Sequence, residues 1–261
     1  MVYPEECKDE IAKIEKLTNI YRETHIHVPG IKDTLADRII LQEDLGDLLA
    51  QKAFSLVKLA ERKRLLEKVA DILVKLKGIP CAHTASILDT ARMKWEMDFF
   101  LTHFAPHYLP AVKDSETTND LRQRLYRMVD RISPIDTFAH RDFHSRNMLI
   151  HKNEIYLVDF QDSLIAPPFY DLVSFAFDSY LDLKSRGDFF IRCLEDRGMA
   201  IDWEPLYITA LQRNIKALGT FGYQVTVRKN LSYKKYIHRT IRHIVANKLL
   251  DRFLPRSLFS G

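Results

Sequence analysis

Apolar side chains recur at helical spacing along most of the chain, and the first such run lies within residues 5–24. The apolar positions that share one side of this predicted helix are Ile11, Ile14, Leu17, Ile20 and Tyr21. The sequence VPG at residues 28–30 ends the helix. Residues 38–42 form the next short apolar run, which predicts a strand followed by a polar turn.

The region from 48 to 132 has the same periodicity and is expected to be helical throughout. Its first amphipathic stretch is ended by Gly78 and Pro80. The positions assigned to the core of that stretch are Phe54, Leu56, Val57, Leu59, Leu65, Leu66, Val69, Ile72, Leu73 and Leu76. A second helix places Met93, Met97, Phe100 and Phe104 in one stripe, and a third covers residues 115–132.

The C-terminal third is also predicted to be helical. Asp202 has the position of an N-cap residue, with Pro205 in the first turn. The segment after this helix concentrates basic side chains among tyrosines: Arg228, Lys229, Lys234, Lys235, Arg239 and Arg242. Such a stretch can bind nucleic acid, but at helical spacing it is more often a solvated face, so nucleic acid is not the expected partner.

Two short strands interrupt the helical pattern in the middle of the chain. Residues 148–150 and 155–158 are apolar and are joined by the polar turn 151–154, which predicts a β-hairpin. The hairpin is expected to bring Asn147, at its start, beside Asp159, at its end.

Candidate catalytic residues surround this hairpin. The sequence HRDFHSRN fits H-x-D-x-x-x-x-N with His140, Asp142 and Asn147, and Asp159 follows twelve residues after Asn147. Phosphoryl transfer needs one carboxylate to accept the proton of the attacking hydroxyl, and oxygen ligands that hold magnesium on the nucleotide phosphates. Aspartate and asparagine are also common in ordinary turns and caps, but the combined offsets favour a phosphotransferase site.

These residues lie in segments that resemble the aminoglycoside phosphotransferase/choline kinase family, relatives of the protein kinases. The segments HRDFHSRNMLI, VDFQDSLIAPPFYDLVSF and LQRNIKALGTFGYQ are most similar to the bacterial anomeric sugar kinases of that family, which phosphorylate N-acetylmuramate and N-acetylglucosamine in cell-wall recycling. The resemblance runs from about residue 9 to about residue 253. It implies an α+β, protein-kinase-like fold with a small nucleotide lobe and a helix-rich C-terminal lobe.

The resemblance also assigns roles to residues. It implies that Asp142 is the base, that His140 holds the catalytic loop, and that Asn147 and Asp159 bind Mg²⁺. The nucleotide contacts implied are the carbonyl of Gln42 and the N–H of Asp44 at a hinge, and Glu15, which would pair with a lysine of a preceding strand. A plain strand with a turn, and a solvated surface glutamate, are the alternatives for these positions.

The acceptor side is less defined by the resemblance. The residues assigned to substrate contact are His144, Arg146, Asp162 and Glu96, and Asp171 is expected to brace the catalytic loop. Asp171 also suits the first turn of a helix, where a carboxylate contributes roughly 0.3–1 kcal/mol. The stripe on the helix that carries Glu96 is more often core than a binding face.

The start of the chain departs from the family. Kinases of this kind have three strands, a glycine-rich phosphate loop and a strand lysine before the first helix, whereas only residues 1–4 precede it here and the first glycine is Gly30. We therefore expect residues 1–46 to be a remnant of the nucleotide lobe with its hinge, and residues 47–261 to form the C-terminal lobe. The exposed sheet edge of such a remnant favours self-association.

Composition adds that the chain can bury a core, since 46% of its 261 residues are hydrophobic, and that its net charge of +4 is modest. Three widely spaced cysteines indicate a reducing compartment, and no apolar run reaches the length of a membrane span, so a cytoplasmic protein is expected. The predicted function is an ATP- and Mg²⁺-dependent kinase of a sugar or aminosugar hydroxyl. The alternatives are a catalytically weak kinase-like binding protein, an aminoglycoside or choline-type kinase, and a basic nucleic-acid-binding module at 228–242.

Overall fold

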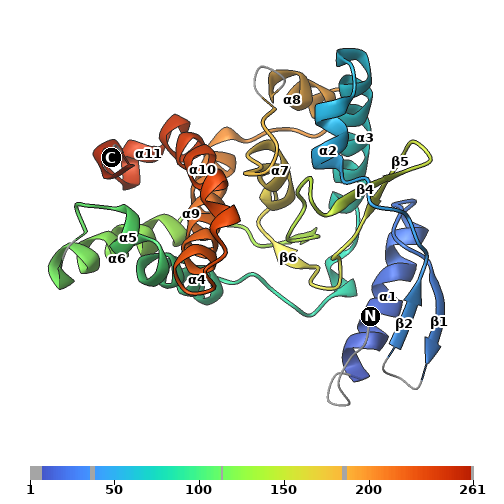
Figure 1. Ribbon diagram of the computed structural model, residues 1–261, viewed down its shortest axis with the longest axis horizontal. Coiled ribbons are helices and arrows are strands. Elements are labelled where there is room, and N and C mark those ends of the chain that lie inside the picture. The colour runs from blue at the N-terminus through green and yellow to red at the C-terminus, as the bar shows by residue number, and fades with distance from the viewer. Residues whose placement is uncertain (1–7, 36–38, 113, 184–186, 260–261) are drawn as a thin grey trace. The chain divides into compact units, whose positions relative to one another are not determined.

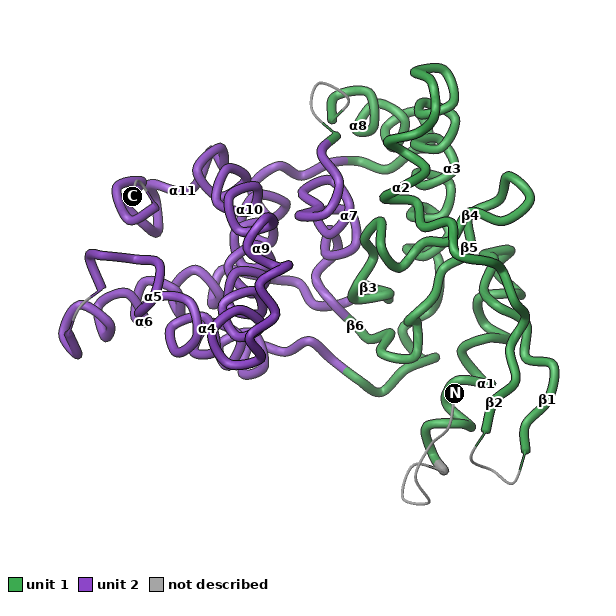
Figure 2. Tube along the Cα trace, in the orientation of Figure 1, with its two compact units in different colours: residues 1–86, 137–165, 183–200 green, residues 87–136, 166–182, 201–261 purple. Residues whose placement is uncertain are grey.

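The structure is a computed structural model that describes residues 8–35, 39–112, 114–183 and 187–259 (Figure 1). The chain divides into two compact units (Figure 2). Unit 1 comprises residues 1–86, 137–165 and 183–200, and unit 2 comprises residues 87–136, 166–182 and 201–261. The division at residue 46 that the family resemblance implies stays a prediction.

Unit 1 begins with the predicted helix, α1 (Lys8–Glu23), whose five apolar positions are all buried. Two antiparallel strands follow, β1 (Ile31–Leu35) and β2 (Ile39–Gln42), and Figure 1 shows them beside α1. The strand predicted over 38–42 is confirmed for residues 39–42. Arg38 lies outside the described residues. The apolar pattern does not predict β1, so β2 has a neighbour that the sequence did not reveal.

Two helices, α2 (Ala50–Leu56) and α3 (Leu59–Lys77), stand where one amphipathic stretch is predicted. Val57 and Lys58 adopt extended backbone between them, with ψ of 156° and 165°. The assignment of Leu56 and Leu59 to the core is therefore wrong, because the break leaves them 69% and 56% exposed. The other elements of unit 1 are a 3-10 turn (Cys81–His83), strands β3 (Thr137–Ala139), β4 (Met148–His151) and β5 (Glu154–Leu157), and helix α8 (Gly187–Glu195). Strand β6 (Leu164–Ala166) also begins in unit 1, and its last residue is counted in unit 2.

The strands of the described chain pair in three two-stranded sheets, β1 with β2, β3 with β6 and β4 with β5. Short sheets of this kind cannot stand alone, so their stability depends on the helices packed against them. In unit 1 α3 contacts both β3 and α8, and α2 contacts β4.

Unit 2 is built mainly of helices in its described part. Its elements are α4 (Thr90–His103), α5 (Ala105–Tyr108), α6 (Ser115–Val129), α7 (Tyr170–Ala176), α9 (Trp203–Thr226), α10 (Lys234–Ala246) and α11 (Leu250–Phe253), with 3-10 turns at Leu231–Tyr233 and Arg256–Phe259. Sequence signals set their ends. The Asp202 carboxylate accepts from the Glu204 N–H at the start of α9, and Asp114 and Thr117 form a capping box at the start of α6.

The longest helix, α9, lies at the centre of unit 2 and packs against α4, α7 and α10. Its contact with α4 is close because Gly219 and Gly222 face the backbone of Phe100 and His103. The predicted stripe on α4 is core, since Met93, Met97, Phe100 and Phe104 are fully buried. Among the described residues, no helix combines the length and apolar character needed to cross a membrane.

Candidate active site

The hairpin predicted in the middle of the chain is formed by β4 and β5. Its register pairs Met148 with Leu157 and His151 with Glu154. The turn therefore has two residues rather than the four predicted, and Lys152 and Asn153 reverse the chain with φ of 49° and 64°. Two residues in the left-handed region match the right-handed twist of the strands, which fixes the register of the pair.

This register brings Asn147 and Asp159 together, as the sequence predicts. The Val158 N–H donates to the Asn147 carbonyl at 3.0 Å, which continues the ladder one step past the strands. The Asn147 side-chain nitrogen Nδ2 donates to the Asp142 carbonyl at 3.0 Å and lies 3.4 Å from Asp159 Oδ2. One amide thus links the backbone of the proposed base to the second aspartate.

Backbone contacts hold the loop that carries Asp142. The buried Ser145 accepts a hydrogen bond on its carbonyl from the Gln51 N–H of α2, at 3.1 Å, and the His144 N–H donates to the Asp142 carbonyl at 3.0 Å. Arg141 has φ of 80°, a conformation that costs a non-glycine residue on the order of 1 kcal/mol or more. Its Nη1 forms an ion pair with Asp162 Oδ2 at 3.1 Å, so the side chain stabilises the loop in this conformation.

His140 connects this loop to the segment after the hairpin. The side chain is fully buried, and its Nε2 donates to the Val158 carbonyl at 3.1 Å, one residue before Asp159. Burial lowers the pKa of His140 from its ordinary value, so the ring is neutral near pH 7. A neutral, buried ring bonded to backbone suits the predicted role of holding the loop.

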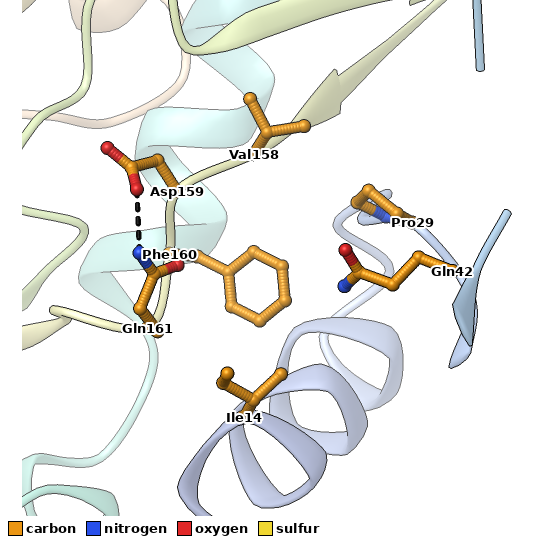
Figure 3. A pocket seen from close by; sticks show the side chains of 7 residues that line it. All are labelled: Ile14, Pro29, Gln42, Val158, Asp159, Phe160 and Gln161. Carbon is orange, nitrogen blue, oxygen red and sulfur yellow. Dashed lines mark hydrogen bonds between the residues drawn. The ribbon is translucent and has the colours of Figure 1, made fainter. Parts of the chain in front are cut away.

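A cavity of about 300 Å³ lies beside the hairpin exit in unit 1. The residues that line it are Ile14, Pro29, Gln42, Val158, Asp159, Phe160 and Gln161 (Figure 3). Ile14, Pro29, Val158 and Phe160 make most of its wall apolar, and Asp159 and Gln161 make one end polar. The volume is at the lower end of the range for small-molecule sites.

The three predicted nucleotide contacts differ in their placement. Gln42 lines the cavity beside the hairpin exit. The Asp44 carboxylate accepts from the Gly46 N–H at 2.9 Å and stabilises the turn after β2. Glu15 is exposed and accepts from the Thr34 hydroxyl of β1 at 2.8 Å. The hinge contacts and the lysine partner of Glu15 stay predictions.

The segment after β2 is also tied to the hairpin. His151 Nδ1 donates to the Leu45 carbonyl at 3.1 Å, and the Ile150 N–H donates to the Leu48 carbonyl at 2.8 Å. On the other side, the Leu157 N–H donates to the His27 carbonyl at 2.8 Å. These bonds fasten the segments that follow α1 and β2 to the hairpin within unit 1.

The predicted substrate residues fall in both units. His144 and Arg146 are half-buried in the catalytic loop, and Asp162 is in the ion pair with Arg141. Glu96, on α4 of unit 2, is 4% exposed. Asp171 is buried in the first turn of α7, in unit 2. The roles of all five residues stay predictions.

Two glutamines near these residues are not singled out by the sequence. Gln161 Nε2 donates to Asp159 Oδ1 at 2.6 Å, and Gln212 Nε2 donates to Glu96 Oε2 at 2.7 Å. Lys216, one helical turn after Gln212, has its Nζ 3.9 Å from Glu96 Oε1. The spacing of Gln212 and Lys216 places both on one face of α9 and is the only sequence signal for this contact.

The residues at the hairpin exit suit a magnesium ion. The two hydrogens of Asn147 Nδ2 face the Asp142 carbonyl and the Asp159 carboxylate, which leaves Asn147 Oδ1 as the amide atom that can ligate. Asp159 adds an exposed carboxylate. Mg²⁺ prefers oxygen ligands, keeps several waters and takes few protein ligands, so an amide oxygen and a carboxylate fit it.

The fold, together with a loop aspartate beside an asparagine–aspartate pair, is that of a kinase-like phosphotransferase. The chain belongs to the phosphotransferase enzyme family APH, whose model matches residues 3–207. An N-acetylmuramate/N-acetylglucosamine kinase of Pseudomonas aeruginosa is 23% identical over 179 residues, which are 68% of this chain and 51% of that protein. The chain thus spans about half the length of this relative.

Solved structures of the family share the fold. A choline/ethanolamine kinase family protein from Mesorhizobium loti has a TM-score of 0.62 and 13% identity, over 96% of this chain and 85% of that chain. The aminoglycoside phosphotransferase APH(3'')-Id from Streptomyces rimosus, in complex with ADP and streptomycin, has a TM-score of 0.55 and 15% identity, over 81% and 84%. The predicted α+β, protein-kinase-like fold is confirmed.

Proposed function

We propose that the chain is an ATP-dependent kinase that phosphorylates a hydroxyl of a sugar or aminosugar of the N-acetylmuramate/N-acetylglucosamine type. The observation that carries the proposal is the Asn147 side chain, whose nitrogen links the Asp142 carbonyl to the Asp159 carboxylate. Family membership adds support for a kinase, and the relative from Pseudomonas aeruginosa supports the acceptor class.

In this proposal Asp142 accepts the proton of the attacking hydroxyl. Its backbone carbonyl is held by Asn147 and by the His144 N–H, so the loop geometry is set before an acceptor binds. Positioning of this kind is the main contribution that a protein makes to phosphoryl transfer.

Asn147 Oδ1 and the Asp159 carboxylate would hold Mg²⁺, which neutralises charge on the nucleotide phosphates when it is bound. The cavity beside Asp159 would take the nucleotide, with the base against the apolar wall and the phosphates toward the polar end. The solved relative that contains ADP is consistent with a nucleotide cofactor.

His140 serves this arrangement without contacting the reactants. Its bond to the Val158 carbonyl joins the start of the catalytic loop to the residue before Asp159. Because this bond joins the two segments that carry Asp142 and Asp159, removal of the ring should alter the geometry of both aspartates together.

The test is phosphoryl transfer from ATP in the presence of Mg²⁺, with acceptors supplied one at a time. N-acetylmuramate and N-acetylglucosamine represent the proposed class, while kanamycin and choline represent the acceptor types of more distant members of the fold. Mass spectrometry identifies the phosphorylated product. We expect turnover with an acetylated aminosugar. Turnover only with kanamycin or choline would reject the acceptor class, and nucleotide binding without transfer to any acceptor would favour a kinase-like binding protein.

A further inference from the structure

Both oxygens of the Asp159 carboxylate are contacted by side-chain amides. Gln161 Nε2 lies 2.6 Å from Oδ1, and Asn147 Nδ2 lies 3.4 Å from Oδ2. Figure 3 shows the Gln161 amide directed at the carboxylate, at the polar end of the cavity. The glutamine bond is the shorter of the two by 0.8 Å, so it is the stronger constraint on the side chain.

The chemistry of the groups fixes the orientation of both amides. An ionised carboxylate only accepts hydrogen bonds, so the nitrogen of Gln161 must face it. The Asn147 nitrogen is fixed in the same way, because its other contact is the Asp142 carbonyl, which also only accepts.

The second carboxylate after the hairpin has a different environment. Asp162 forms an ion pair with Arg141, at 3.1 Å, which compensates its negative charge. Asp159 is held by two neutral amides, which orient the carboxylate, and none of the described cations forms an ion pair with it. Of these two carboxylates, Asp159 is therefore the one prepared to attract a cation.

We propose that Gln161 is a positioning residue, which holds the Asp159 carboxylate in the orientation that binds the metal of the nucleotide complex. The inference rests on the proposed function, because it requires Asp159 to be a metal ligand. Each carboxylate oxygen has two lone pairs, so one hydrogen bond to each oxygen leaves room for the cation.

The conformation and exposure of Asp159 give this support a purpose. Asp159 has φ of 63°, in the left-handed region, and its side chain is exposed rather than packed in the core. Exposed carboxylates move among rotamers, and ordering one when the metal binds lowers the affinity. Hydrogen bonds to ligating groups typically change metal affinity by about 10–100-fold.

The experiment replaces Gln161 with methionine, which keeps the length of the side chain and removes its donor. Calorimetry measures the Kd of ATP for the full chain with Mg²⁺ and with a chelator, and the ratio of the two constants gives the gain due to the metal. The matched control is Gln123→Met, at an exposed position of α6, and Asp159→Ala removes the carboxylate itself. Thermal unfolding without metal detects any general loss of structure.

We expect Q161M to bind ATP without Mg²⁺ as tightly as the wild type does. Its ratio of the Kd without Mg²⁺ to the Kd with Mg²⁺ should be smaller than that of the wild type by about 10-fold or more, and so approach the ratio of D159A. The control Q123M should keep the wild-type ratio. A purely structural role for Gln161 would instead change the Tm or the metal-free Kd, and would leave the metal ratio unaltered.

The two proposals fail in different ways. If Q161M kept the wild-type ratio of the two Kd values while D159A lost it, the role of Gln161 would be overturned and the proposed function would be left intact. A wild-type chain without any Mg²⁺-dependent gain would overturn the metal site itself, and the role of Gln161 with it.

Discussion

Substitution of Gly222 by alanine should separate α4 from α9 and destabilise unit 2. A Cβ atom at this position would lie 2.4 Å from the His103 carbonyl oxygen, 2.8 Å from its carbon and 2.9 Å from the Phe104 Cα. All three atoms belong to the backbone of α4 or its C-terminal cap, so no side chain can rotate away to make room. The helices themselves must move apart.

Two effects of opposite sign determine the size of the change. Alanine is a better helix former than glycine by about 1 kcal/mol in a helix interior. Overpacking a close contact costs about 1–3 kcal/mol or more, and contact with backbone on several sides favours the upper end. We expect the free energy of unfolding to fall by about 2 kcal/mol in G222A.

The assay is urea unfolding followed by far-ultraviolet circular dichroism. Gly187, at the start of α8, is the matched control because a Cβ there would meet nothing within 4 Å. The control G187A should be neutral or stabilising by up to about 1 kcal/mol. If G222A were as stable as the wild type, the close approach of α4 and α9 would be refuted.

Other predictions concern buried polar groups. The Tyr21 hydroxyl donates to Ser163 Oγ at 2.8 Å, because the hydrogen of Ser163 Oγ is directed at the Phe160 carbonyl, 2.6 Å away. Y21F should therefore lower the free energy of unfolding by about 1 kcal/mol. A double-mutant cycle with S163A should show that the two substitutions are coupled, whereas additive effects would contradict the bond. Burial lowers the pKa of His243 to about 4 from 6.5. In the unfolded chain His243 takes up a proton near pH 6.5, whereas in the folded chain it does so only near pH 4. The contribution of His243 to the free energy of unfolding should therefore be constant above pH 6.5 and fall as the pH drops from 6.5 to 4. Urea unfolding of H243Q at several pH values should lack this loss of stability between pH 6.5 and 4. The same pH dependence in H243Q and the wild type would contradict the lowered pKa of His243.

The sequence predicts the elements whose apolar residues are regularly spaced. Helix α1 follows from five buried positions at helical spacing, and the hairpin follows from two apolar runs around a polar turn. Strand β1 is not predicted, because its sequence IKDTL is mostly polar and its pairing with β2 depends on backbone hydrogen bonds. The break between α2 and α3 is hidden for a related reason, since Lys58 is an ordinary helix former.

The candidate site shows the same division between local and long-range information. Asp142, Asn147 and Asp159 lie within one short segment, so a hairpin suffices to predict that the last two meet. Gln212 contacts Glu96 from 116 residues away, and spacing alone cannot predict such a contact. Gln161 is adjacent to the motif, but its role depends on the rotamer that points its amide at Asp159.

The central claim is that Asp142 is the base of a phosphoryl-transfer site, and turnover by D142N tests it most directly. The comparison uses an acceptor that the wild-type chain phosphorylates, with D120N as control because Asp120 is an exposed aspartate in a surface ion pair on α6. We predict that kcat falls by about 10²–10⁴-fold in D142N while the Kd of ATP with Mg²⁺ stays within a few-fold of the wild type, and that D120N is fully active. Full turnover by D142N would contradict the assignment of the base and the account of the site built on it.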